Sequence, residues 1–326
     1  MLPIAAIVVT HNSEGVIQAC LDSLEHVQEA VVVDNASTDA TMDYCLSRSV
    51  ARLIVNQTNR GFAAAVNQGA AASTAPYLLI CNPDIAVLDD LGPLIEAAAR
   101  HGAAAGQLVD AQGVAQAGFT VRRFPGAAAL VLEALGINRL WPSNPVNRRY
   151  RCLDRDLAES GPVQQPAGAF LLVRRDVFEA VGGFDDGFYP VWFEDVDFCR
   201  RILDCGYTIW YESGVRARHT GAHSVGRLDP ESRARYWYAG LLRYAEKYLP
   251  RPGFTVVCAA VAAGAVPRMI AGILLERSGK PIATFRTVIR MALTSLLSGR
   301  TPTVTSVNAG NEGEREGRAS LSHPAR

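Results

Sequence analysis

Short apolar runs alternate with longer segments over the first part of the chain. The runs IAAIVVT, AVVVD, RLIV and YLLIC occupy residues 4–10, 30–34, 52–55 and 77–81. In the segments between them apolar positions recur at helical spacing, and helices are predicted from Ser13 to Leu24, after Asp39, from Gly61 and from about Asp89. Uninterrupted apolar strands separated by helices are typical of parallel βαβ units, because both faces of such a sheet are covered. The pattern predicts an α/β fold with a Rossmann-like, mixed but mostly parallel sheet flanked by helices.

The pattern changes along the second half of the chain. Residues 110–165 are irregular and rich in arginine and proline, and a helix is predicted over about 231–249. We therefore expect a main domain over residues 1–250 and an apolar, helical, membrane-associating extension over 251–300. The polar segment 301–326 lacks the apolar residues needed to form a core, so a disordered tail is predicted there.

Polar side chains follow three of the predicted strands directly. The carboxyl ends of parallel strands meet at one edge of a sheet, where ligands bind to α/β proteins. We expect a site at this edge. Its candidate residues are Thr10, His11 and Asn12 after the first run, Asp34 and Asn35 after the second, and Asn82, Pro83 and Asp84 after the fourth.

Each candidate near the first three strands also has an ordinary structural explanation. Asp34 could accept a hydrogen bond from a nucleobase or a ribose, or it could organise its own turn. Gly61 opens an alanine-rich helix and permits close approach of the backbone, whereas Asn59 could simply cap that helix. Arg60 could pair with a base or a phosphate, or remain solvated.

Acidic and histidine side chains provide the sharper candidates. Asp84, on a short loop, could bind Mg²⁺ or Mn²⁺, which favour oxygen ligands, or it could form a turn. Glu194 and Asp195 lie where a helix is predicted to begin, so that capping explains one carboxylate more easily than several. His219 ends a strand-like segment and would matter as a metal ligand only if Asp84 lies nearby.

Composition excludes some classes of function. The formal net charge is +0 and no nucleic-acid-binding motif is present, so nucleic acid is not an expected partner. No GxGxxG follows the first strand, which disfavours a dinucleotide-dependent dehydrogenase. A sugar-phosphate nucleotidyltransferase would need a glycine-rich segment near its N-terminus that VVTHNSEG does not supply. Seven dispersed cysteines without a CxxC pair indicate reduced thiols in a cytoplasmic protein.

Six motifs in order resemble one known family over about residues 3–250. The chain resembles the inverting family 2 glycosyltransferases of GT-A fold, and in particular bacterial rhamnosyltransferases that extend lipid-linked glycans. The motifs are IVVTHNSEGVIQACLDSL, VVVDNASTD, NRGFAAAVNQG, LLICNPD, GGFDDGFYPVWFEDVDFCRR and RHTGAHSVG. Each motif is weak alone, whereas their order and spacing are specific for the family and much less so for the sugar.

The resemblance implies a role for individual residues. Asp34 would bind the donor nucleotide, and Asp84 would be the metal-facing carboxylate of the family's DxD, here Asn82-Pro83-Asp84. His219 would be an additional metal ligand, and Asp195 of the Glu194-Asp195 pair would be the catalytic base. Asn82 stands where many relatives carry aspartate, which weakens the expected metal site.

The same resemblance implies a reaction. A divalent cation would stabilise the charge that develops on the departing nucleoside diphosphate. Asp195 would take the proton of an acceptor hydroxyl that attacks the anomeric carbon from the opposite face, so that one displacement inverts the configuration. dTDP-rhamnose is the expected donor by resemblance only. A non-catalytic relative that binds a nucleotide sugar or serves as a membrane scaffold is the alternative.

The C-terminal extension decides how the protein meets a membrane. Residues 254–275 are mostly apolar, but Pro267 and Arg268 interrupt them, and a spanning helix needs about 20 consecutive apolar residues. We predict an interfacial or hairpin segment, with Arg286 and Arg290 on one face of the next helix. An ordinary packed helical pair that closes the domain is the alternative.

The expected partners follow from these assignments. They are a nucleoside-diphosphate sugar and a glycan or polyprenyl-diphosphate-linked acceptor. The arginines at 148, 149 and 151 could meet the diphosphate of this acceptor or anionic lipid headgroups. We expect a cytoplasmic protein in peripheral contact with the inner face of the plasma membrane, and a homodimer is compatible with the sequence.

Overall fold

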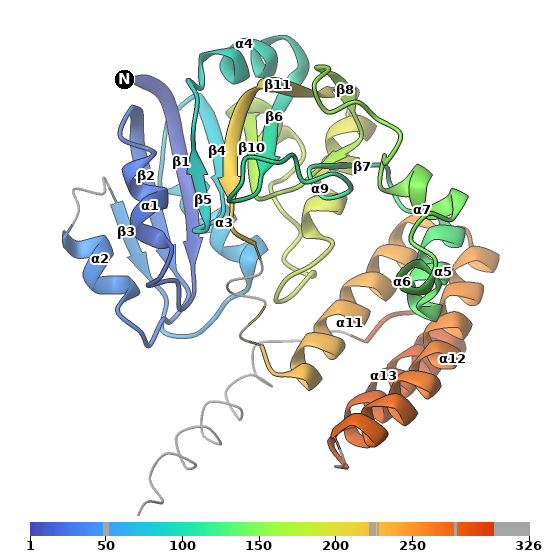
Figure 1. Ribbon diagram of the computed structural model, residues 1–326. Helices are drawn as coiled ribbons and strands as arrows, with labels where there is room; N and C mark the ends of the chain where they lie inside the picture. The colour runs from blue at the N-terminus through green and yellow to red at the C-terminus, as the bar shows by residue number, and fades with distance from the viewer. Residues whose placement is uncertain (48–51, 222–225, 227, 277–278, 303–326) are drawn as a thin grey trace, which may run out of the picture.

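The computed structural model describes residues 1–47, 52–221, 226, 228–276 and 279–302, which fold into a mixed sheet, flanking helices and a C-terminal layer of helices (Figure 1). The predicted disordered tail, 301–326, lies outside the described residues from 303 onward.

The strands are β1 (Leu2–Thr10), β2 (Val27–Asp34), β3 (Arg52–Val55), β4 (Tyr77–Cys81), β5 (Ile85–Val87), β6 (Gly102–Val109), β7 (Val121–Arg122), β8 (Gly161–Val163), β9 (Gln165–Pro166), β10 (Phe170–Arg174) and β11 (Thr208–His219). The helices are α1 (Ile17–Asp22), α2 (Thr41–Ser47), α3 (Phe62–Ala71), α4 (Gly92–His101), α5 (Ala127–Leu135), α6 (Ile137–Leu140), α7 (Pro145–Tyr150), α8 (Arg175–Ala180), α9 (Glu194–Asp204), α11 (Pro230–Tyr248), α12 (Arg251–Glu276) and α13 (Lys280–Ser298).

The main sheet has the strand order β3-β2-β1-β4-β10-β6-β11-β5, and β8 pairs with β11. β1, β2, β3, β4, β6 and β11 run in one direction, whereas β5, β8 and β10 run in the opposite direction. The predicted mixed, mostly parallel sheet flanked by helices is confirmed. The four strands expected near the N-terminus form β1 to β4 as predicted.

Alternate residues of the central strands face opposite sides of the sheet, and each side has its own core. Ala5, Ile7 and Val9 of β1 pack with α3, α8 and α9 in one cluster. Ile4, Ala6 and Val8 pack with α1 and α4 in the other. Because both faces are buried, the strand is apolar at consecutive positions, as expected for a parallel sheet.

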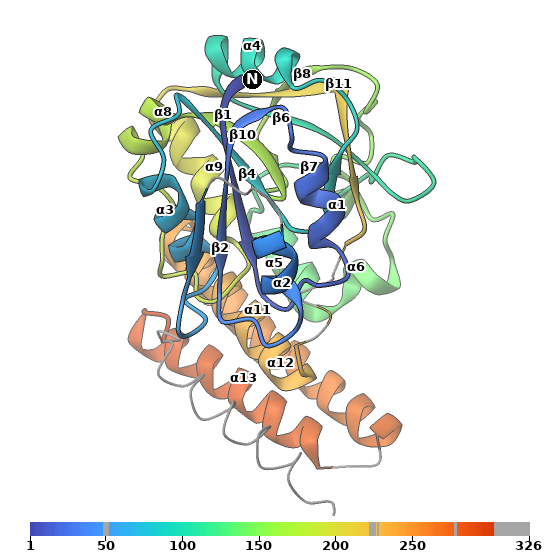
Figure 2. The same ribbon diagram turned by 90° about the vertical axis from the view of Figure 1, so that its left-hand side faces the viewer.

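The stretch 110–165, irregular by sequence pattern, contains three short helices that join the sheet to the C-terminal layer. α5 packs on α6, α7 and α12, and it shares a third hydrophobic cluster with α11, α12 and α13. Figure 2 shows α12 and α13 side by side below the sheet. The C-terminal helices therefore form one packed layer with α5 and α11.

α12 continues through Pro267 and Arg268, so these residues interrupt the apolar run of the sequence but not the helix. The Arg268 guanidinium donates to the Gly264 carbonyl within the same helix at 2.8 Å and to the Glu133 carbonyl of α5 at 3.1 Å. The second bond ties α12 to α5 next to Pro267, which has no backbone N–H to donate. The reversal of the hairpin comes between α12 and α13 instead.

Candidate functional site

A cavity of about 510 Å³ lies at the carboxyl ends of β1 and β4 and extends to α5 and α9. Asp84 and Asp195, which are far apart in the sequence, both line it. The other predicted site residues in its wall are Thr10, Asn59, Asn82, Glu194 and His219. Asn12, Asp34, Arg60 and Gly61 are not among its lining residues.

Strand pairing brings Asp84 and His219 together. β11 pairs antiparallel with β5, and His219 lies opposite Ile85, the residue after Asp84. The Thr220 N–H donates to the Asp84 carbonyl at 3.3 Å. The His219 Nε2 lies 3.5 Å from the Asp84 Oδ2, and both side chains are buried.

Gln116 determines which nitrogen of His219 carries the proton. The Gln116 Nε2 donates to the His219 carbonyl at 2.8 Å, so that its Oε1 faces the His219 Nδ1 at 2.9 Å and accepts a hydrogen bond from it. Burial lowers the pKa of His219 below its ordinary 6.5, although Asp84 opposes this effect. The lowered pKa favours the neutral ring at neutral pH, and the Phe119 ring stacks on it with centroids 4.9 Å apart.

The contact between Asp84 and His219 therefore brings two acceptor atoms face to face. The Nε2 lone pair and the carboxylate oxygen repel each other unless a cation lies between them. A carboxylate and a neutral imidazole fixed through its other nitrogen form a donor set suited to a divalent metal. The described residues contain no group of three or more His, Cys, Asp and Glu side chains that could hold a metal ion. Further ligands would have to come from substrate phosphates or water, as is usual for Mg²⁺.

Asp195 lies at the start of α9 and is held from the neighbouring loop. Its Oδ2 accepts the Gly168 N–H at 3.1 Å and lies 3.5 Å from the Gln165 Nε2. A Cβ at position 168 would lie 2.7 Å from the Cβ of Asp195, so only glycine permits this approach. Its other oxygen, Oδ1, accepts the N–H of Val196 at 2.8 Å. The carboxylate is thus oriented by backbone and amide donors at the cavity wall.

Glu194, the neighbour of Asp195, is the most unusual carboxyl of the site. It is 5% exposed, and its Oε2 is buried without a hydrogen-bond partner. Burial, reinforced by the charge of Asp195, raises the pKa of Glu194 well above its ordinary 4.5. The two residues before it, Trp192 and Phe193, have φ of 82° and 71°, a strained conformation for large side chains. Strain and a buried orphan oxygen together make Glu194 a candidate functional residue.

The variant Glu194→Gln is expected to stabilise the fold relative to the wild type at neutral pH. The folded pKa of Glu194 is raised, so folding keeps a proton that the unfolded chain loses, and wild-type stability falls as pH rises above 4.5. The glutamine side chain does not titrate, so the Tm difference should widen as pH rises from ~5 to ~8 in thermal melts. The control variant Glu96→Gln, at an exposed position, should show no such trend. A constant difference across this range would contradict the account.

Asp34 is held within its own turn. The carboxylate is 1% exposed; its Oδ1 accepts the Thr10 hydroxyl at 2.9 Å and its Oδ2 accepts the Ser37 N–H at 2.9 Å. The Asn12 side chain accepts the Thr38 N–H at 2.8 Å in the same turn. The structural explanation for Asp34 therefore accounts for its contacts, and a role toward a nucleotide would act through the turn that it organises.

Of the predicted residues just before α3, one lines the cavity and two do not. Asn59 lines the cavity, and its Oδ1 accepts the Gly61 N–H at 2.9 Å. Gly61 has φ of 83°, and an added Cβ would lie 2.9 Å from the Tyr189 ring, so glycine is required there. Arg60 is exposed at the surface.

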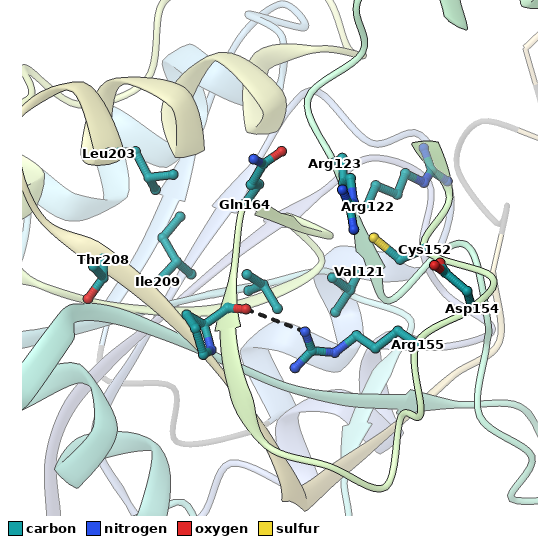
Figure 3. Close-up of a pocket in the computed structure, with 12 residues that line it drawn as sticks. Val121, Arg122, Arg123, Cys152, Asp154, Arg155, Gln164, Leu203, Thr208 and Ile209 are labelled. Atoms are coloured by element: carbon teal, nitrogen blue, oxygen red, sulfur yellow. Dashed lines mark hydrogen bonds between the residues drawn. The ribbon is translucent and has the colours of Figure 1, made fainter. Parts of the chain in front are cut away.

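A second cavity of about 500 Å³ contains none of the predicted site residues (Figure 3). Arg122, Arg123 and Arg155 line it, and the Arg155 guanidinium donates to the Pro162 carbonyl at 3.4 Å, as Figure 3 shows. Arg122 also lines the larger cavity. The residues predicted for catalysis and metal binding, Asp84, Glu194, Asp195 and His219, all line the larger cavity instead.

Sequence reasoning missed Gln116, Gln165, Gly168 and Arg122. Gln116 lies in the irregular stretch, where no periodicity indicates that it approaches His219. Gln165 and Gly168 belong to QPAGAF, just before the buried strand β10. They precede β10 and reach the site because β10 runs antiparallel to β4, so the rule that identified Asn82 and Asp84 after their strand does not lead to them.

Comparison with known proteins identifies related sequences. Residues 5–182 match the family model described as glycosyl transferase family 2. The N-acetylglucosaminyl-diphospho-decaprenol L-rhamnosyltransferase of Mycobacterium tuberculosis is 31% identical over 71% of this chain and 80% of its own length. The rhamnosyltransferase WbbL of Escherichia coli K12 is 26% identical over 75% of this chain and 92% of its own.

The fold has relatives among solved structures. A crystal structure of GalNAc-T7 with UDP, GalNAc and Mn²⁺ superposes with a TM-score of 0.57 at 14% identity. The superposition covers 93% of this chain and 58% of that longer chain. The resemblance of the sheet and its helices to glycosyltransferases of GT-A fold is confirmed.

Proposed function

Because the chain belongs to glycosyltransferase family 2, we propose that it transfers a sugar with inversion from a nucleoside-diphosphate donor to a hydroxyl of a lipid-linked glycan. The observation that carries the proposal is the convergence of Asp84, His219 and Asp195 on one cavity. A cation-binding pair and a separate carboxylate in one cavity are what a single displacement of a nucleoside diphosphate needs.

The proposed donor is dTDP-rhamnose and the proposed acceptor is a polyprenyl-diphosphate-linked glycan. Two relatives that cover most of this chain have names with rhamnosyl transfer in common, and one name specifies an N-acetylglucosaminyl-diphospho-decaprenol acceptor. Such a reaction places the protein at the inner face of the plasma membrane, in the assembly of cell-surface polysaccharide.

The donor nucleotide is proposed to lie at the carboxyl ends of β1 and β2, against α3. Thr10, Asn59 and Asn82 line the cavity there with polar atoms. Asp34 and Asn12 support this wall through the turn after β2, and Gly61 allows the backbone to approach. Arg60, at the exposed rim, would meet the nucleotide only as it enters. The proposed donor-binding residues are thus Thr10, Asn12, Asp34, Asn59, Arg60, Gly61 and Asn82.

Asp84 and His219 are proposed to hold a divalent metal, Mg²⁺ or Mn²⁺. The facing acceptor atoms and the fixed tautomer of His219 support this proposal. The structural neighbour GalNAc-T7 was crystallised with Mn²⁺. When bound, the metal would neutralise charge on the diphosphate as it departs. Asn82 contributes a neutral side chain to the same wall, at the position where many relatives carry an aspartate.

Replacing Gln116 by Leu is expected to weaken metal activation by about 10–100-fold, because outer partners of a ligating histidine fix its tautomer. Titration of turnover against Mn²⁺ would give the activation constant. Gln112, an exposed glutamine in the same irregular stretch, provides the matched control as Gln112→Leu. An unchanged activation constant in Gln116→Leu would show that His219 needs no such support.

Asp195 is proposed as the base that removes the proton from the acceptor hydroxyl. Its carboxylate lines the cavity and is oriented by the Gly168 N–H. A carboxylate is a weak base, but it suffices when proton transfer is concerted with departure of the diphosphate. Glu194 is proposed to act beside it in the same reaction.

The acceptor diphosphate is proposed to meet Arg151 and Arg122 at the α5 end of the cavity. The Arg151 Nε donates to the Asn147 side chain at 3.1 Å, and its Nη2 lies 3.8 Å from Glu133. The Arg122 Nε donates to the Gly118 carbonyl at 2.8 Å, and Arg122 lines the cavity. Arg148 and Arg149 are exposed on α7 and would suit lipid headgroups instead.

The exposed face of α12 is proposed to contact the membrane. Residues 251–275 are long and apolar enough to cross a membrane, and 33% of the helix window is buried. The exposed positions of this helix include Val256, Val266, Ile270, Leu274 and Leu275, with no exposed charge between residues 252 and 275. Because α12 also packs on α5 and α13, peripheral contact suits it better than spanning.

The full protein is expected to float with anionic liposomes, and the double variant Ile270→Ser, Leu274→Ser is expected to bind at least about tenfold more weakly. Both side chains are more than half exposed, so the fold should tolerate the change. Leu46→Ser with Val55→Ser, at exposed positions far from α12, is the matched control. Absence of flotation in the wild type would contradict the membrane proposal.

A panel of nucleoside-diphosphate sugars tests the proposed function. Release of nucleoside diphosphate is measured with an N-acetylglucosaminyl-diphospho-lipid acceptor, with and without EDTA. We expect acceptor-dependent release that EDTA abolishes, greatest with dTDP-rhamnose. Binding of a donor without release under any condition would instead identify a non-catalytic nucleotide-sugar-binding relative.

A further inference from the structure

We infer that Gln165 and Glu194 form a hydroxyl-binding subsite that holds the acceptor sugar beside Asp195. The inference deepens the proposed function and rests on it. Two unpartnered oxygen atoms of residues that line the cavity carry it: Gln165 Oε1 and Glu194 Oε2. Both are buried, and neither has a hydrogen-bond partner among the described residues.

The orientation of Gln165 follows from its neighbours. Its Nε2 lies 3.5 Å from the Asp195 Oδ2 and from the Pro166 carbonyl, both of which accept hydrogen bonds. Reversing the amide would set its oxygen against these two acceptors. The Oε1 must therefore point away from them, and Gln165 is only 2% exposed. A buried amide oxygen without a donor is destabilising, so an orphan of this kind calls for an explanation.

Glu194, the residue before Asp195, presents the second oxygen without a hydrogen-bond partner. Its carboxyl is buried, and Oε2 has no partner among the described residues. Trp192, next to it in the cavity wall, has the left-handed backbone described above. A Cβ at Gly240 of α11 would lie 2.7 Å from the Trp192 carbonyl, so α11 has glycine where this turn packs. The fold thus accommodates strain that keeps Glu194 in place.

A sugar ring supplies the partners that these oxygens lack. Each hydroxyl both donates and accepts, so it can satisfy the amide oxygen of Gln165 and also a carboxyl of Glu194 in either protonation state. Because both side chains neighbour Asp195, the ring that they hold is the one whose hydroxyl loses its proton. The subsite therefore binds the acceptor sugar through hydroxyls other than the attacking one.

The test pairs variants with monodeoxy acceptors, using a short-chain N-acetylglucosaminyl-diphospho-lipid and its deoxy analogues. The variant Gln165→Met removes the amide but keeps the length of the side chain. We expect a KM for the intact acceptor raised about tenfold, the loss of one good hydrogen bond, with the donor KM unchanged. Gln164→Met, at the exposed neighbouring glutamine that lines the second cavity, should leave both constants unchanged.

One deoxy analogue identifies the contact. Wild-type enzyme should accept it with a KM raised about tenfold, and Gln165→Met should lower its use no further, because the partner hydroxyl is already absent. The wild-type measurement with the analogues holds even if Gln165→Met fails to fold. If Gln165→Met lowers transfer to every acceptor equally, Gln165 only positions Asp195 and the inference is overturned. The inference is also overturned if removing each acceptor hydroxyl other than the attacking one in turn leaves wild-type turnover unchanged. Absence of diphosphate release from every donor would instead overturn the proposed function together with the inference.

Discussion

Asp195→Asn is expected to lower sugar transfer by about 10²–10⁴-fold while donor affinity changes little. The amide keeps the size of the side chain and can still lie beside the Gly168 N–H, but it cannot take a proton from the acceptor. Donor contacts come from the opposite wall, around Thr10 and Asn59, and should survive. Initial rates with saturating acceptor, together with donor titration by calorimetry, separate the two effects.

The control for this variant lies on the same helix. Asp204, at the end of α9, is exposed and lies 3.4 Å from Arg200 in an ion pair, so Asp204→Asn should retain nearly full activity. Substantial turnover by Asp195→Asn would remove Asp195 from the role of base. Equal loss of donor binding would show instead that the substitution disturbs the whole cavity.

Asp84→Asn is expected to lower turnover by at least about 100-fold at ordinary Mg²⁺ or Mn²⁺ concentrations. Removing a residue that hydrogen-bonds to a metal ligand lowers metal affinity or activity by about 10–100-fold. Removing a direct ligand should lower activity at least as much. The amide retains a weak oxygen donor, so high Mn²⁺ should restore part of the activity. Turnover measured against metal concentration gives both quantities.

Asp90, exposed in the loop that follows β5, provides the matched control as Asp90→Asn and should respond to metal as the wild type does. An Asp84→Asn protein with normal activity and normal sensitivity to EDTA would contradict the metal role. If activity fell while the metal response stayed unchanged, Asp84 would act on the substrate directly.

The sequence predicts the sheet well where apolar runs and helices alternate, and poorly elsewhere. β1 to β4 follow from runs that are apolar at consecutive positions, because both sheet faces are buried. The antiparallel position of β10 between β4 and β6 could not be predicted, since pairing between distant strands leaves no local pattern. The contacts of Arg268 with α5, beside Pro267 in the continuous helix α12, are likewise tertiary and leave no local pattern.

The site could be predicted in part for the same reason. The expectation that polar residues after parallel strands meet at one edge of the sheet correctly leads to Thr10, Asn82 and Asp84, which line the cavity. The approach of His219 to Asp84 depends on the register of β11 against β5, which the motif order suggests but local sequence cannot set. Asp34 lies at the expected rim, yet its carboxylate is taken up by Thr10 and the turn after β2. Whether a polar residue faces a cavity or its own turn is decided by packing.

The most direct measurement of the central claim is the configuration of the newly formed glycosidic bond, determined by NMR on the product of the wild-type enzyme. A cation at Asp84 on one side of the anomeric carbon and a single base, Asp195, on the other predict one displacement. The product should therefore have the anomeric configuration opposite to that of the donor. A product that retains the donor configuration would contradict the account.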